Sequence, residues 1–169
     1  MRPSANIRRS TKEDIPSILE IFKSAKQYMR LQGNKSQWGD QYPGEKDIEK
    51  DIENGVSFVG IDGEGGIFMT FAFVTGEDPT YKKIWEGEWL NDSPYGTIHR
   101  IASNGKSRGV LQFACDYCFE IVDNLRIDTH KDNKAMLKAL NDLEFKKCGV
   151  IICRDGSPRV AFQKCKVTQ

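Results

Sequence analysis

The chain has 169 residues, and its 25 Lys and Arg against 24 Asp and Glu leave a net charge of +1. This length allows a substantial core without disulfides or metal, so we expect a single domain over residues 1–169. The near-zero net charge argues against a general attraction to nucleic acid or to an acidic membrane. The first ten residues lack an apolar signal segment, and no apolar run approaches the length of a membrane span, so we expect a cytoplasmic protein.

The chain has five cysteines, an odd number that favours reduced thiols over a disulfide framework. They are Cys115, Cys118, Cys148, Cys153 and Cys165. A redox pair gains reactivity at the start of a helix, whereas Cys115 and Cys118 fall inside a helical segment. The spacing of the last three does not suit a zinc finger or knuckle. Buried structural thiols are therefore favoured over a zinc or redox site, and no metal is expected.

The first half of the chain predicts a strand, two helices and a β-hairpin. Apolar residues recur at helical spacing in the first helix, and the second helix is more polar. The loop between the helices, residues 33–44, is unusually rich in aromatic residues. The glycine-rich turn over 62–66 joins the two strands of the hairpin. The expected elements are a strand at 6–9, helices at 15–31 and 45–54, and strands at 56–61 and 67–75.

The second half predicts an irregular segment over 76–94, with room for a short helix, and then alternating strands and helices. Asp132 is the expected cap of the last helix. The expected elements are a strand at 98–103, a helix at 110–122, a strand at 125–129, a helix at 133–142, and strands at 145–153 and 159–166. The order β-α-α-β-β-β-α-β-α-β-β predicts a mixed α/β domain with helices covering the sheet.

The turn at 104–109, Asn-Gly-Lys-Ser-Arg-Gly, lies between a predicted strand and a predicted helix. The first backbone N–H groups of a helix have no partner within it, and the helix dipole favours negative charge there. The dipole alone contributes only about 0.3–1 kcal/mol at an exposed site, so the charges of Lys106 and Arg108 add needed attraction. The turn therefore predicts an anion site suited to a ligand that carries a pyrophosphate.

The order of the elements, this basic glycine turn and the helix that begins near Asn133 together resemble the GCN5-related N-acetyltransferase (GNAT) superfamily over almost the whole chain. Within it, the chain is most similar to a mostly uncharacterised bacterial group. The shared stretches are Gln37-Trp38, Tyr95 to Ala102, Arg126 to His130, and Asp132-Asn133. The resemblance implies a central, mixed and mostly antiparallel sheet flanked by helices.

The phosphate loop of that family follows the pattern Gln or Arg, two residues, Gly, one residue, then Gly or Ala. Here the central glycine, Gly109, is kept, whereas Lys106 replaces Gln or Arg and Leu111 replaces the small residue. The resemblance implies acetyl-CoA as co-substrate, with its pyrophosphate on the N–H groups of Lys106, Ser107, Arg108, Gly109 and Val110.

The resemblance also implies where the rest of the cofactor lies. The pantetheine arm would pair, like an added strand, with the backbone of Ile101, Ala102 and Ser103. The strand at 125–129 would splay away from that strand and leave a gap for the thioester. Asn133 matches a family position that contacts the cofactor near the pantetheine, and its alternative role is that of a helix cap.

Acetyl transfer to an amine needs a base, because only about a thousandth of a lysine-like amine is unprotonated at pH 7. His99, on the strand that would line the gap, is the first candidate, and a structural role is an equal alternative. His130 is the second candidate, and for it a role in ordering the next loop is favoured. The tyrosine that protonates the CoA thiolate in many relatives is replaced here by Leu140, so another group serves or no dedicated acid is needed.

On the acceptor side we expect Trp38, Tyr42, Trp85 and Glu86, which suit an amine with an apolar body. Packing of the aromatic residues as a lid is the competing interpretation. The predicted function is acetyl-CoA-dependent acetylation of a primary amine, first of a small molecule and second of a peptide or protein. The alternative is a non-catalytic acyl-CoA sensor of the same fold. No nucleic acid or membrane partner is expected, and a homodimer is compatible with the sequence.

Overall fold

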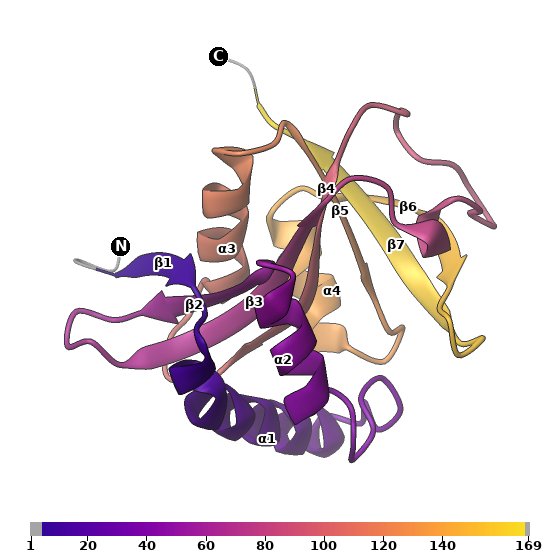
Figure 1. Ribbon diagram of the computed structural model, residues 1–169. Coiled ribbons are helices and arrows are strands. Elements are labelled where there is room, and N and C mark those ends of the chain that lie inside the picture. Colours follow the sequence, from indigo (N-terminus) through magenta and orange to yellow (C-terminus); the bar gives the residue numbers. More distant parts are fainter. Residues whose placement is uncertain (1–4, 168–169) are drawn as a thin grey trace.

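In a computed structural model, which describes residues 5–167, one seven-stranded sheet runs through the molecule with helices on both faces (Figure 1). The strand order is β1-β2-β3-β4-β5-β7-β6, and every neighbouring pair is antiparallel except β4 and β5. The strands are β1 (Asn6–Arg9), β2 (Ser57–Ile61), β3 (Ile67–Thr75), β4 (Gly96–Ser103), β5 (Asn124–Thr129), β6 (Lys146–Ile152) and β7 (Pro158–Cys165). The helices are α1 (Ile15–Leu31), α2 (Glu45–Glu53), α3 (Val110–Phe119) and α4 (Lys134–Asp142), with short 3-10 turns η1 (Lys12–Asp14) and η2 (Pro79–Tyr81). The expected element order and fold class are confirmed.

The largest core cluster lies between the sheet and helices α3 and α4. Strand residues that alternate along β3, β4 and β5 point to this face, because successive side chains of a strand face opposite sides. They pack on the apolar stripes of the two helices, and Leu140 of α4 is completely buried there. This face is therefore sealed by ordinary helix-on-sheet packing.

The opposite face is covered in two parts. Helices α1 and α2 cover β2, β3 and the second half of β4, with Ile18, Val59 and Ala102 in that cluster. The irregular segment 76–95 covers β5, β7 and β6 with a separate cluster around Tyr81 and Tyr95. The side chains of this segment therefore cover this part of the sheet, as a third helix would.

Two details of the expected helices are wrong. Helix α3 ends at Phe119 and not at Val122, because the N–H groups of Glu120 and Ile121 donate to the carbonyl oxygens three residues earlier, those of Tyr117 and Cys118, and so tighten the last turn. The cap of α4 is Asn133 and not Asp132: the Asn133 side-chain oxygen accepts a hydrogen bond from the Met136 N–H at 3.1 Å. This is ordinary N-cap geometry.

Candidate functional site

Strands β4 and β5 are paired only at their beginnings. Their parallel register joins Gly96 to Leu125 and Thr97 to Arg126, and it stops there. From Ile98 to Ser103, β4 is bonded to β3 on one side, and on its other side no strand of residues 5–167 continues the ladder. The predicted splay is thus present, and it leaves strand backbone available to an extended ligand.

The basic glycine turn leads from the free half of β4 into α3. Gly109 is the N-cap of α3, with a left-handed φ of +70°, and its carbonyl oxygen accepts the Phe113 N–H. The N–H groups of Val110, Leu111 and Gln112 precede that first helical bond, so they have no acceptor within the helix. Lys106 and Arg108 are exposed beside them. The end of the turn can therefore receive a phosphate.

The beginning of the turn is already engaged. The Gly105 N–H donates to Ser103 Oγ at 3.2 Å, and the Lys106 N–H donates to Asn104 Oδ1 at 3.0 Å. The expectation that the Lys106 N–H binds pyrophosphate conflicts with this second bond. The side chain of Lys106 remains free to supply positive charge.

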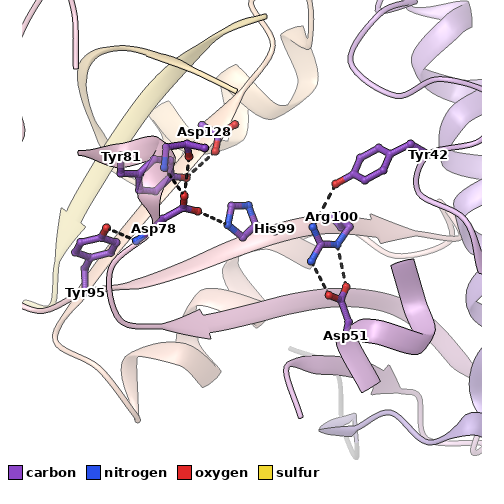
Figure 2. Close-up of polar contacts among 9 residues, drawn as sticks. Tyr42, Asp51, Asp78, Tyr81, Tyr95, His99, Arg100 and Asp128 are labelled. Carbon is purple, nitrogen blue, oxygen red and sulfur yellow. Dashed lines mark hydrogen bonds and ion pairs between the residues drawn. The ribbon is translucent and has the colours of Figure 1, made fainter. Parts of the chain in front are cut away.

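His99 lies on β4 two residues beyond Thr97, the last residue that pairs with β5, and an acidic residue holds its ring. His99 Nε2 lies 3.1 Å from Asp78 Oδ2, and Asp78 also accepts hydrogen bonds from the N–H and hydroxyl of Thr80 (Figure 2). Burial acts to raise the pKa of Asp78, but the hydrogen bonds from His99 and Thr80 outweigh it and lower that pKa to about 2. With Asp78 ionised, Nε2 of His99 is the donor, which leaves Nδ1 free to accept a proton.

Tyr81 connects this pair to the neighbouring strand. Its hydroxyl donates to Asp128 Oδ2 on β5 at 2.6 Å, and its ring lies 6.4 Å from the His99 ring (Figure 2). Burial of Tyr81, and then the negative charge of Asp128, raise the pKa of the phenol well above 10, so it stays a donor. Two carboxylates and one imidazole therefore meet where the two strands separate.

A second cluster lies on the other side of His99. Arg100 has a left-handed φ of +51° inside a β-bulge, where two residues of β4 stand opposite one residue of β3. Its guanidinium bonds both oxygens of Asp51 at 2.8 and 2.9 Å and donates to the Tyr42 hydroxyl at 3.2 Å (Figure 2). This pair ties α2 and the loop over 33–44 to β4.

His130 orders the end of β5. Its Nδ1 accepts the Asp132 N–H at 3.0 Å, so its Nε2 carries the proton that faces Ser36 Oγ at 3.0 Å. Burial and then the charge of Arg159 lower its pKa. Both ring nitrogens are occupied, an arrangement that supports the structural interpretation of His130.

Gln37 fastens the loop over 33–44 across the end of β5. Its side-chain oxygen accepts from Asn34 and Asn133 at 3.0 and 3.1 Å and lies 3.5 Å from the Thr129 hydroxyl. Both polar atoms of the Asn133 side chain are thus engaged, one as the helix cap and one with Gln37. Asn133 therefore positions the loop whether or not it also meets a cofactor.

The four residues expected on the acceptor side do not form one group. Trp38 is buried and packs edge-on against Phe22 of α1, which agrees with the interpretation of the aromatic residues as a packed lid. Tyr42 is exposed and stands beside Arg100. Trp85 bridges to Val150 on the edge strand β6, and the exposed Glu86 follows it in a turn. Of these four, Tyr42 is joined by a hydrogen bond to the site around β4.

Three acidic residues of the site were missed by the sequence analysis: Asp51, Asp78 and Asp128. An available signal was the Asp-Pro pair at 78–79, which favours a turn in which the carboxylate bonds nearby N–H groups. Asp128 lies within the quoted stretch from Arg126 to His130, where it alternates with buried neighbours. Asp51 carried no signal that distinguished it from the other acidic residues of a polar helix.

The remaining predictions concern Leu140, the cysteines, metal ions and a membrane span. Leu140, at the position of the tyrosine, is a core residue. Cys115 and Cys118 are buried in α3, and burial raises the pKa of Cys115 to about 12, as expected for structural thiols. Residues 5–167 contain no group of three His, Cys, Asp or Glu side chains that could hold a metal ion. None of the helices described is long and apolar enough to cross a membrane.

Solved structures similar to this one come from acetyltransferases. An acetyltransferase of the GNAT family from Streptococcus agalactiae is 33% identical, with 99% of each chain covered and a TM-score of 0.88. One from Listeria monocytogenes is 19% identical over 95% of this chain and 94% of that chain, with a TM-score of 0.68. A phosphinothricin acetyltransferase from Sinorhizobium meliloti, in complex with AcCoA, is 14% identical over 96% and 89%, with a TM-score of 0.60. No protein-family model and no curated protein sequence matches the chain.

Proposed function

Because the chain belongs to the GNAT family of acetyltransferases, we propose that it transfers the acetyl group of acetyl-CoA to a primary amine of a small molecule, with His99 as the base. The observation that carries the proposal is the position of His99. Its imidazole stands where β4 leaves β5, it is held by Asp78, and none of the described residues hydrogen-bonds to its second nitrogen.

The residues present fit acetyl-CoA in two respects. The half of β4 beyond Thr97 offers unpaired backbone along which a pantetheine arm can lie, with Ile101, Ala102 and Ser103 on that stretch. The start of α3 offers free N–H groups beside Arg108 and Lys106 for a pyrophosphate. When bound, acetyl-CoA supplies an activated thioester carbonyl that an amine can attack.

His99 has to make the amine nucleophilic. An alkylammonium with a pKa near 10 is almost wholly protonated at pH 7, which costs roughly 4 kcal/mol of barrier. Nδ1 of His99 accepts the amine proton, directly or through water, and Asp78 stabilises the charged imidazolium at Nε2. Asp128 adds a second negative charge nearby that attracts a cationic acceptor into the site.

Protonation of the departing thiolate needs no tyrosine at the position of Leu140. A thiol has a pKa near 8.5, so water protonates most of the thiolate at neutral pH without a dedicated acid. The replacement of that tyrosine by Leu140, a core residue, is nevertheless the observation that favours a second candidate function, an acyl-CoA sensor without turnover. In the sensor, acetyl-CoA would bind and CoA would not be released.

Amine-dependent release of CoA tests the proposal and separates the two candidates. The purified chain is mixed with acetyl-CoA and single amines, free thiol is followed with a chromogenic reagent, and products are identified by mass spectrometry. The proposal expects release with at least one amine and a mass gain of one acetyl group. Tight acetyl-CoA binding with no release from any amine would support the sensor instead.

A further inference from the structure

Arg159, the second residue of β7, is a buried cation that has no buried counter-ion among residues 5–167. The residue is only 8% exposed, and its guanidinium donates to Ser157 Oγ at 2.9 Å, to the Pro158 carbonyl at 3.0 Å and to the Gln37 carbonyl at 3.4 Å. All three acceptors are neutral oxygens. Within residues 5–167, no carboxylate forms an ion pair with it. Burial of an unpaired charge is costly, so this arrangement needs an explanation.

The protein's own acids compensate Arg159 weakly. Asp155 is linked to it only through Ser157, whose hydroxyl donates to Asp155 Oδ1 at 2.5 Å, and Asp155 is itself exposed. The two other arginines near the site are held differently. Arg100 is paired with Asp51. Arg126, which is 4% exposed, lies between the rings of Trp89 and Tyr95 at 4.1 and 4.0 Å and donates to the Asn91 carbonyl oxygen, and its Nε has no hydrogen-bond partner within residues 5–167.

Arg159 lies next to the proposed acceptor site. Asp128 is directly opposite Ala161 in the β5–β7 ladder, and Arg159 is two residues from Ala161 on the same face. Such diagonal neighbours are about 7–8 Å apart, so one small ligand could contact both the short carboxylate of Asp128 and the long side chain of Arg159. Arg159 also contacts the loop over 33–44 through the carbonyl oxygen of Gln37. Burial is the main cause of the lowered pKa of His130, and the positive charge of Arg159 is the second. It therefore stands where this loop, the turn before β7 and the end of β5 meet.

We propose that the acceptor carries a carboxylate close to its amine, as an amino acid or a small amino-carboxylate does, and that Arg159 binds this carboxylate. The inference rests on the proposed function. A guanidinium presents a planar fork of donors that matches a carboxylate, and such charge-assisted bonds are among the stronger ones. With the carboxylate on Arg159, the amine points toward Asp128 and the free nitrogen of His99.

The test compares matched acceptors. Each amino acid of a panel is assayed for CoA release beside its carboxamide and its decarboxylated amine, which keep the amine and lose the negative charge. The wild type is expected to prefer the carboxylate member about 10- to 100-fold in kcat/KM. Arg159→Met should abolish this preference, mainly through KM, Arg159→Lys should keep part of it, and Arg154→Met, at an exposed arginine of the same turn, should keep all of it.

The outcomes separate this inference from the proposed function. Acetylation of amines with no preference for the carboxylate, or a preference that survives in Arg159→Met, would overturn the role of Arg159 and leave the transferase intact. No CoA release from any member of any set would overturn the transferase, and the inference with it. Acetyl-CoA affinity serves as the folding control for each variant. If Arg159→Met does not fold, the wild-type preference and its reduction in Arg159→Lys decide the matter.

Discussion

The expected cofactor side of the site and its proposed acceptor side are formed by different kinds of chemical group. The expected cofactor side consists of backbone groups of regular elements, the free half of β4 and the first turn of α3, with two exposed cations beside them. The proposed acceptor side consists of side chains from the loop over 33–44, the segment 76–95, and the strands β4, β5 and β7. These side chains are held by hydrogen bonds to one another.

This difference separates binding of the cofactor, which the fold can provide in many proteins, from choice of the acceptor, which depends on the side chains of this chain. Strand backbone and helix N-terminal groups can bind one shared cofactor with almost any side chains on the same fold. In our proposal, side chains such as His99, Asp128 and Arg159 select the acceptor through charge and shape. Changes on the cofactor side should therefore alter acetyl-CoA affinity, and changes on the acceptor side should alter rate and acceptor KM.

The largest effect is expected from Gly109→Glu, which places a carboxylate at the N-terminus of α3. No atom lies within 4 Å of a Cβ added at Gly109, so the fold should persist despite a cost of about 1 kcal/mol for a left-handed φ. Repulsion of the phosphates should weaken acetyl-CoA binding more than about 100-fold, measured by calorimetric titration.

Gly109→Ala is the matched control, because it introduces the same backbone strain at the left-handed φ without adding a negative charge. It should retain acetyl-CoA affinity within several-fold. Equal affinity of Gly109→Glu and the wild type would remove the phosphate site from this turn.

His99→Ala should next reduce the acetylation rate about 100- to 1,000-fold, the usual contribution of a positioned base. Acetyl-CoA affinity should stay within about twofold, since the imidazole is on the acceptor side of β4. Single-turnover kinetics, with the affinity measured in parallel, test both statements. If His99→Ala acetylated at the wild-type rate, His99 would have only a structural role.

Asp78→Asn probes the group that holds His99, through the pH dependence of stability. The pKa of Asp78 is about 2 in the folded protein and near 3.8 when unfolded, so its carboxylate stabilises the fold above pH 4 and loses this effect as the pH falls toward 2. The wild type should therefore lose about 2 kcal/mol more than the variant between pH 5 and pH 2 in denaturant-unfolding measurements. Parallel pH curves would show that Asp78 is not the carboxylate responsible.

The smallest effect is expected for Gln37→Ala, which leaves the amides of Asn34 and Asn133 without their shared acceptor. We expect a loss of about 1 kcal/mol in unfolding free energy and a few-fold rise in acceptor KM, with acetyl-CoA affinity unchanged. Gln41→Ala, at an exposed position of the same loop, is the control. A change in acetyl-CoA affinity alone would contradict the separation of the two sides.

The same contrast explains what could be predicted from the sequence. Periodicity and turn chemistry decide local structure, so the element order and the glycine turn before α3 were expected from the residues themselves, whereas the splayed strand was implied by the resemblance to the acetyltransferases. Asp78, Asp128 and Arg159 acquire their roles through partners far along the chain: the Tyr81–Asp128 bond joins residues 47 positions apart, and the contact from Arg159 to Gln37 joins residues 122 apart. Trp38 shows the reverse case, an aromatic loop residue that the fold buries against α1.

Hydrogen–deuterium exchange with and without acetyl-CoA tests the central claim most directly, because it locates the cofactor on the chain. The account predicts slower exchange of backbone amides over 98–103 and 107–112, with little change over 76–95 and 153–159 until an acceptor is added. An unchanged exchange pattern over 98–112 at saturating acetyl-CoA, or protection confined to the acceptor-side segments, would contradict it.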